Sequence, residues 1–164
     1  MTFNSKTILQ PSRYYLWAVL LLLSFSYAQA TFVQVSQISS PVGYVSLSEA
    51  VAPGTTYQTI QPNLTSSGYT FGYWSVGGNR LTDSDGRSIT RGEITVNAAT
   101  TITAHYFLST ADTDTDGLLD WFEFRNFGNL DQNASSDSDA DGFTNGQENG
   151  LGQEPTVKDS VQYG

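Results

Sequence analysis

Two stretches of twelve residues near the end of the chain repeat one acidic pattern. The first, residues 112–123, reads DTDTDGLLDWFE, and the second, residues 137–148, reads DSDADGFTNGQE. In both, aspartates occupy positions 1, 3 and 5, a glycine occupies position 6, and a glutamate stands at position 12. A solvated acidic tail, the simplest alternative, has no reason to repeat this order twice. The pattern therefore predicts two loops that each wrap around a cation.

The spacing suits the ligands that calcium requires. Ca²⁺ takes roughly 6–8 oxygen ligands at about 2.3–2.6 Å, and both stretches fit the calcium loop of the EF-hand, D-x-[DN]-x-[DN]-G-x5-E. Gly117 and Gly142 fall at position 6, where the backbone turns sharply and a Cβ is costly. The acids of the first loop repel one another unless a cation lies among them. Mg²⁺ fits less well, because it demands tight octahedral geometry and dehydrates reluctantly.

The loop positions predict the ligands. Carboxylates at positions 1, 3 and 5 point inward, and position 7 contributes its backbone carbonyl. Position 9 binds directly or through water, and the closing glutamate supplies two oxygens. The predicted ligands are Asp112, Asp114, Asp116, Leu118, Asp120 and Glu123 in the first loop, and Asp137, Asp139, Asp141, Phe143, Asn145 and Glu148 in the second.

Residues 1–30 have the composition of a secretory signal peptide. Lys6 and Arg13 precede an apolar run at 14–27, and residues 28–30 read AQA, a typical cleavage site. The alternative, a retained membrane anchor, needs about 20 apolar residues, and this run is shorter. We therefore expect a secreted or cell-surface protein that is free of the membrane once the signal peptide is cleaved.

The charge distribution predicts a domain boundary near residue 110. Residues 31–110 carry four acidic and three basic residues, whereas residues 111–164 carry twelve acidic and two basic ones. Such a change in composition marks the junction of two domains. We therefore expect a β-rich domain at 31–109, the paired calcium loops at 110–157 and a tail at 158–164.

Several functions are disfavoured by what the chain lacks. There is no basic patch, which argues against nucleic acid as a partner. There is no cysteine, so a bound metal is the remaining common way to stabilise a small exported module. His105 is the only histidine and lacks the companions of a zinc site or a catalytic triad, so we do not expect an enzyme.

Residues 31–109 show the alternation of half-buried strands. Within 68–74 (GYTFGYW), period-two alternation places Tyr69, Phe71 and Tyr73 on one face and Trp74 on the other. Residues 77–92 are expected to form an ordinary connection, with a hairpin turn at 83–86. Apolar and polar residues also alternate around Val33 and Val35, Val45 and Leu47, Ile94 and Val96, and along Ile102, Ala104 and Tyr106.

Two segments of this region resemble a known family. Residues 68–75 (GYTFGYWS) followed by 94–107 (ITVNAATTITAHYF) are similar to the internalin-type B-repeat, or Listeria–Bacteroides repeat, of bacterial surface proteins. The resemblance covers about residues 42–107. It implies a small β-grasp-like sheet that acts as a spacer or adhesive unit, without catalysis.

The acidic segment resembles a second family. Neither loop is preceded by a convincing helix. Residues 119–127 carry a helical apolar stripe of Trp121, Phe124 and Phe127 that Gly128 ends, and residues 144–149 are expected to form a shorter exit helix that ends at Gly150. Residues 114–148 are similar to the thrombospondin type 3-like calcium repeats of bacterial exported proteins, a resemblance that covers about 110–157. It implies the ligands named above, apart from the two position-7 carbonyls.

Two functions remain open from the sequence. In the first, two Ca²⁺ ions stabilise an exported spacer or adhesion module that is not an enzyme. In the second, the acidic pair is a dockerin-like module that binds another extracellular protein through Trp121 and Phe122 in the presence of calcium. The second fits less well, because dockerins usually carry an aliphatic residue at loop position 8 of both repeats, where the second loop has Thr144.

Overall fold

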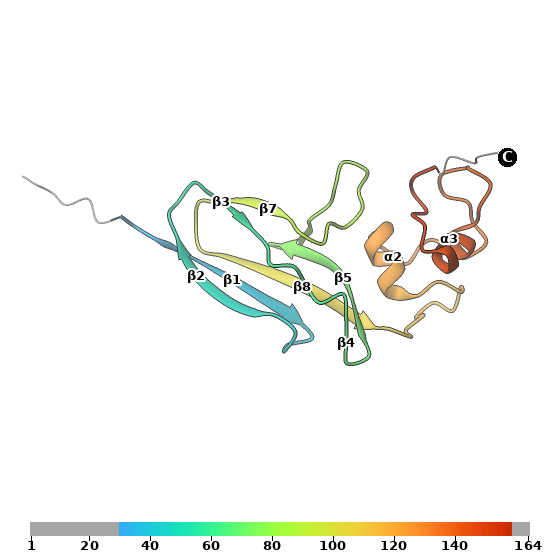
Figure 1. Ribbon diagram of the computed structural model, residues 1–164, viewed down its shortest axis with the longest axis horizontal. Coiled ribbons are helices and arrows are strands. Elements are labelled where there is room, and N and C mark those ends of the chain that lie inside the picture. Colours follow the sequence, from blue (N-terminus) through green and yellow to red (C-terminus); the bar gives the residue numbers. More distant parts are fainter. Residues whose placement is uncertain (1–29, 159–164) are drawn as a thin grey trace, which may run out of the picture. The chain divides into compact units, whose positions relative to one another are not determined.

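The computed structural model describes residues 30–158, and these residues are mainly β, as predicted, with two short helices towards the C-terminus (Figure 1). The predicted signal peptide lies outside the described residues, apart from Ala30. Of the predicted tail, only Lys158 is described. Within the described part, no helix is long and apolar enough to cross a membrane.

Residues 30–158 contain two sheets. The larger has the order β2-β1-β8-β5-β4, with β6 also paired to β5, and the smaller consists of β3 and β7. Strands β1 and β8 are parallel, and the other pairs are antiparallel. The elements are β1 (Val33–Ser40), β2 (Ser46–Val51), β3 (Thr55–Gln58), β4 (Thr65–Ser66), β5 (Tyr69–Val76), β6 (Asn79–Arg80), β7 (Glu93–Val96), β8 (Thr100–Leu108), α2 (Asp120–Asn126) and α3 (Asn145–Leu151).

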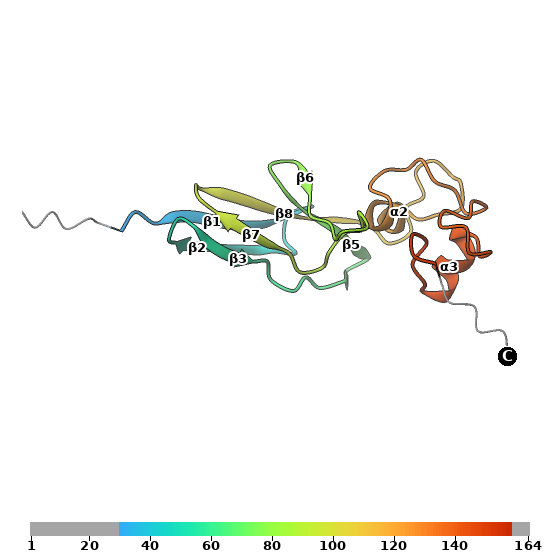
Figure 2. The ribbon, with the colours of Figure 1, turned by 90° about the horizontal axis from the view of Figure 1, so that it is seen from above.

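The alternation in the sequence produces one apolar core. Ile102, Ala104 and Tyr106 are buried along β8, and the residues between them are more exposed, as period-two alternation predicts. The small sheet covers this core, because Tyr57 of β3 and Val96 of β7 belong to the same cluster (Figure 2). The buried members of the cluster are Val35, Val45, Tyr57, Phe71, Trp74, Val96, Ile102, Ala104 and Tyr106.

The face assignment within β5 was wrong beyond Phe71. Phe71 pairs with Tyr106 and Tyr73 pairs with His105, so Gly72 is an extra residue, a β-bulge. One extra residue reverses the alternation, and Trp74 therefore joins Phe71 in the core, their ring centroids 5.8 Å apart. Tyr73 lies on the opposite face, stacked on the His105 ring at 4.3 Å.

This opposite face of β5 and β8 carries a second aromatic group. The ring of Phe107 stacks on that of Phe124 from α2, with centroids 4.8 Å apart, and Tyr73 lies 6.0 Å from Phe124. The imidazole Nε2 of His105 lies 2.8 Å from the hydroxyl of Ser75, and burial lowers the pKa of His105. Helix α2 therefore packs on the β-rich region through Phe124.

The hairpin turn at 83–86 is confirmed. Thr82 and Ser88 form an antiparallel bridge, and the Asp83 carboxylate accepts the backbone N–H groups of Asp85 and Arg87 at 3.0 Å. The expectation that residues 77–92 form an ordinary connection was wrong. The backbone N–H of Ser88 donates to the carbonyl of Arg125 in α2 at 2.8 Å, so this segment contacts the acidic region.

Both exit helices occur, with corrected details. Helix α2 ends before Gly128, whose φ is +84°. Its most buried aromatic side chain is Phe122, which is 4 % exposed and is not a member of the predicted stripe. Helix α3 continues past the predicted end at Gly150 and stops at Gly152, which has φ +72°. Its first turn has a capping box formed by Thr144 and Gln147.

Candidate metal centre

The first acidic loop brings its aspartates together. One carboxylate oxygen each from Asp112, Asp114 and Asp116 lie within 4.8 Å of one another, and such a triplet could hold a metal ion. The Asp112 carboxylate accepts the backbone N–H groups of Asp116 and Gly117, both at 3.2 Å. The Asp116 carboxylate accepts the N–H of Leu118 at 2.9 Å. These bonds curl the backbone around the carboxylates.

The second loop repeats this geometry residue by residue. Asp137, Asp139 and Asp141 also have carboxylate oxygens within 4.8 Å of one another. The Asp137 carboxylate accepts the N–H groups of Asp141 at 3.2 Å and Gly142 at 3.0 Å. The Asp141 carboxylate accepts the N–H of Phe143 at 2.8 Å, as Asp116 does for Leu118. The two stretches therefore share a local fold as well as a sequence pattern.

The backbone torsions also repeat. Gly117 and Gly142, at position 6, have φ of +96° and +102°, as the sequence led us to expect. Thr115 and Ala140, at position 4, have φ of +62° and +61°, a left-handed conformation that non-glycine residues rarely adopt. The left-handed torsion at position 4 could not be predicted from the sequence, because neither threonine nor alanine favours this conformation.

Glu123, which closes the first loop, is a buried acid among other acids. Its side chain is fully buried, and neither carboxylate oxygen has a hydrogen bond of normal geometry. Burial, followed by the charges of Asp116, Asp114 and Asp120, raises its pKa to about 7, and the backbone of Gln132 opposes this shift. A buried carboxylate in this position is costly to ionise unless a positive charge is close.

The closing residue of the second loop is equally buried. Glu148 has no exposed surface and lies in α3, as Glu123 lies in α2. In the same loop, burial and the charges of Asp141 and Asp137 raise the pKa of Asp139, while Lys158 acts in the opposite direction. In the first loop, burial and the charge of Asp116 raise the pKa of Asp114. Both loops thus place mutually repelling acids together.

The residues at position 9 are held by other groups. The Asp120 carboxylate accepts the backbone N–H of Thr113 at 2.8 Å and its hydroxyl at 2.7 Å. The Asn145 side chain accepts the N–H of Ser138 at 3.3 Å and donates to the carbonyl of Asn133 at 3.0 Å. Both side chains therefore brace their loops by accepting the backbone N–H at position 2, that of Thr113 or of Ser138.

The two loops meet at Ala134. The N–H of Gly146 donates to the Ala134 carbonyl at 3.0 Å, and a Cβ on Gly146 would come within 2.9 Å of that oxygen. A Cβ on Gly117 would lie 3.2 Å from the Ala134 methyl. Gly146 therefore has a packing role that the sequence pattern did not reveal, since its position in the loop is unspecified.

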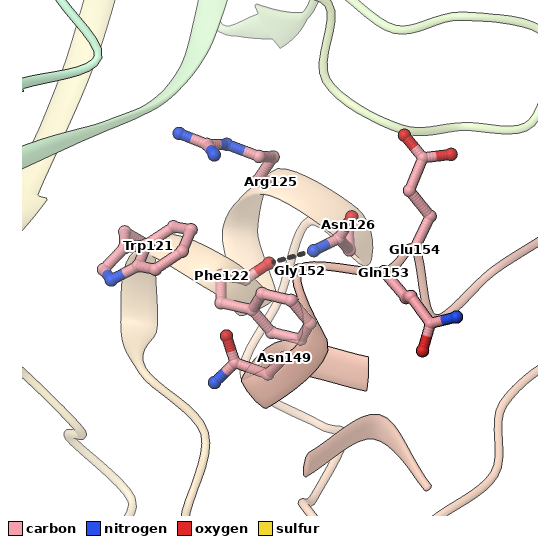
Figure 3. A pocket seen from close by; sticks show the side chains of 8 residues that line it. All are labelled: Trp121, Phe122, Arg125, Asn126, Asn149, Gly152, Gln153 and Glu154. Carbon is pink, nitrogen blue, oxygen red and sulfur yellow. Dashed lines mark hydrogen bonds between the residues drawn. The ribbon is translucent and has the colours of Figure 1, made fainter. Parts of the chain in front are cut away.

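A cleft of about 200 Å³ lies between α2 and the end of α3 (Figure 3). None of the predicted ligands lines it. Trp121 is partly exposed and carries the Arg125 guanidinium 4.8 Å from its ring centroid, whereas Phe122 is packed inside. The lining residues are Trp121, Phe122, Arg125, Asn126, Asn149, Gly152, Gln153 and Glu154.

Comparison with family models, with characterised proteins and with solved structures gives no match to this chain. The candidate centre is therefore described by its own geometry, two similar aspartate triplets, each followed by a helix that carries a fully buried glutamate.

Proposed function

We propose that this is an exported, non-enzymatic protein that binds two Ca²⁺ ions, and that the ions stabilise a surface or secreted spacer or adhesion module. The observation that carries the proposal is Glu123, a fully buried carboxylate beside the triplet Asp112, Asp114 and Asp116. A cation among these groups would offset both the burial of Glu123 and the repulsion that raises its pKa to about 7.

The repetition of the geometry supports a binding role for both loops. Thr115 and Ala140 adopt the same left-handed torsion although neither residue favours it. Backbone strain of this kind persists where the surrounding structure enforces it, and it is concentrated at ligand sites. The donors are all hard oxygen atoms, which favours Ca²⁺ over transition metals, and the flexible geometry of Ca²⁺ tolerates a loop better than that of Mg²⁺.

The sequence resemblance to two known repeat families adds a family assignment to this proposal. We assign the acidic segment to thrombospondin type 3-like calcium repeats and the β-rich domain to B-repeat-like modules with a β-grasp-like sheet. Support comes from the sequence motifs and from the mainly β architecture of residues 33–108. In this role the β-rich domain acts as a spacer or adhesive unit.

The alternative, calcium-dependent docking of an extracellular protein, receives less support. Its predicted contact pair was Trp121 and Phe122, and Phe122 is 4 % exposed. Only Trp121 of the pair has a partly free surface, and Arg125 covers one side of its ring.

Isothermal titration of the metal-free chain with CaCl₂ tests the proposal. We expect two binding events with dissociation constants of about 10⁻³ M or lower, the range of extracellular modules and tighter sites. Glu123→Gln should remove one event and Glu148→Gln the other, because each change takes away the charge of a closing ligand. An unmutated chain that takes up no calcium, or two variants that bind like it, would refute the proposal.

A further inference from the structure

We infer that Arg80, in the β-rich domain, is a positioning residue for the first calcium site. It does not bind the ion but holds helix α2, which carries the ligand Glu123, in place. This inference rests on the proposed calcium function. Its basis is a junction in which groups of β5, β6, β8 and the hairpin contact the backbone, the Arg125 side chain and the Phe124 ring of α2.

The first component of the junction is a cap on the C-terminal end of α2. The last carbonyls of a helix lack partners within the helix. Arg80 donates to the carbonyl of Phe124, and the N–H of Ser88 donates to the carbonyl of Arg125 at 2.8 Å. Two of the carbonyls in the last turn of α2, those of Phe124 and Arg125, are thus bound by the β-rich domain.

Arg80 is itself fixed before it reaches the helix. Its guanidinium also donates to the carbonyl of Gly86 at 2.6 Å and to the Ser88 hydroxyl at 3.3 Å. A Cβ on Gly128 would lie 2.6 Å from the Arg80 Cζ, so the glycine that ends α2 leaves room for this guanidinium. The planar guanidinium with five donors suits several fixed carbonyls at once, which an ammonium group cannot serve in the same geometry.

In the second component the donor belongs to the helix and the acceptor to the sheet. Arg125 of α2 donates to the carbonyl of Phe71, the residue before the bulge at Gly72. A bulge disrupts the local ladder, so a backbone carbonyl there can accept a bond from outside the sheet. Burial lowers the pKa of Arg125, and no carboxylate forms an ion pair with it among residues 30–158.

The third component is aromatic. Phe107 covers Gly72, where a Cβ would lie 2.5 Å from its ring, and the same ring stacks on Phe124 at 4.8 Å. Glu123 lies between Phe122, which is packed inside the acidic segment, and Phe124, which is packed on the sheet. The backbone of Glu123 is therefore fixed by the packing of both neighbouring side chains. Calcium binding, which requires Glu123 in position, is thus coupled to the contacts of the junction.

The second loop has no equivalent anchor among the described residues. Its segment reaches the hairpin through an ion pair between Arg87 and Glu154, which lies after α3. Coupling between two sites is reciprocal. If the junction contacts strengthen calcium binding at the first loop, calcium binding at that loop strengthens the junction contacts by the same free energy. We therefore expect Arg80 to affect the first site and to leave the second unchanged.

The test measures calcium affinity one site at a time in the full chain. Glu148→Gln isolates the first site and Glu123→Gln isolates the second. Arg80→Met is added to each, with Arg80→Lys as the conservative variant and Arg91→Met as the matched control, since Arg91 is exposed and lies outside the junction. Titration calorimetry gives the dissociation constants, and circular dichroism in EDTA checks that each variant retains its sheet.

We expect Arg80→Met to raise the dissociation constant of the first site by about tenfold, within the usual range of coupling between sites. Arg80→Lys should give a smaller increase, and Arg91→Met none. In hydrogen exchange, calcium should slow the amides of β5 and β8 in the unmutated chain and not in Arg80→Met. Equal affinities in Arg80→Met and Arg91→Met would overturn the coupling alone, whereas no calcium binding to the unmutated chain would overturn both proposals.

Discussion

The β-rich region (residues 33–108) and the acidic segment (residues 112–157) have opposite interiors. The first buries a continuous cluster of nine apolar side chains, whereas the described part of the second buries only Leu118, Phe122 and Pro155 of this kind. The buried polar or charged side chains of this segment are Asp120, Glu123, Asn126, Asn145 and Glu148. Apolar burial stabilises the first region on its own. The second buries groups that are costly unless they are paired, so its stability depends on what they bind.

Removal of calcium should produce the largest difference in stability between the two regions. Without the ion, the acids of both loops repel and few apolar side chains offset the chain entropy, so residues 112–148 should lose protection from hydrogen exchange. The amides of β1, β3 and β7, which lie away from α2, should remain protected. The measurement is exchange by mass spectrometry in CaCl₂ and in EDTA. Similar losses of protection in both regions would show that the acidic segment does not depend on calcium more than the β-rich region does.

Loss of the apolar core should have the next largest effect, and it should act without calcium. Trp74→Ala removes a fully buried ring and the hydrogen bond from its Nε1 to the carbonyl of Thr90. We expect a loss of about 3–5 kcal/mol in the free energy of unfolding, measured with urea in EDTA. Val42→Ala is the control, because Val42 is 87 % exposed and should change stability by less than about 0.5 kcal/mol.

Glu123 should show opposite behaviour with and without the ion. In the metal-free chain its pKa is about 7 when folded, against an ordinary value of 4.5, so the folded state holds the proton more tightly. This favours folding below about pH 4.5, and the benefit, at most about 3 kcal/mol, is lost as the pH rises through 7.

A substitution separates the two effects. Glu123→Gln should stabilise the metal-free acidic segment at pH 8 and flatten its pH dependence, because the amide stays neutral. The same change should weaken calcium binding, which the carboxylate favours. Thermal unfolding at pH 5 and pH 8, in EDTA and in CaCl₂, provides the four measurements. A metal-free variant that is less stable than the unmutated chain at pH 8 would contradict this account of Glu123.

The sequence predicted the local features well because they depend on nearby residues. The aspartate triplets form within five residues each, and the glycine at position 6 has the left-handed torsion that its residue type favours. Alternation along β8 also predicted the core face, since no irregularity interrupts that strand between Ile102 and Tyr106.

The features that the sequence missed depend on distant partners. The bulge at Gly72 is defined by pairing with β8 and by the Phe107 ring, neither of which is visible in the GYTFGYW segment. Gln37 is two residues after Val35 and lies on the same face of β1, although its side chain is polar. It is fully buried because the Tyr57 hydroxyl and the Ile60 N–H bind its side chain, both at 2.9 Å.

The parallel pairing of β1 with β8 has a mechanical consequence. Their register runs from Val35 opposite Thr100 to Ser40 opposite His105, so the chain enters the β-rich region at one end of this ladder and leaves it at the other. Tension applied between residues 33 and 108 therefore pulls the two strands past each other along their length. Because the hydrogen bonds of a ladder sheared in this way share the load, we expect the β-rich region to resist stretching between these two residues.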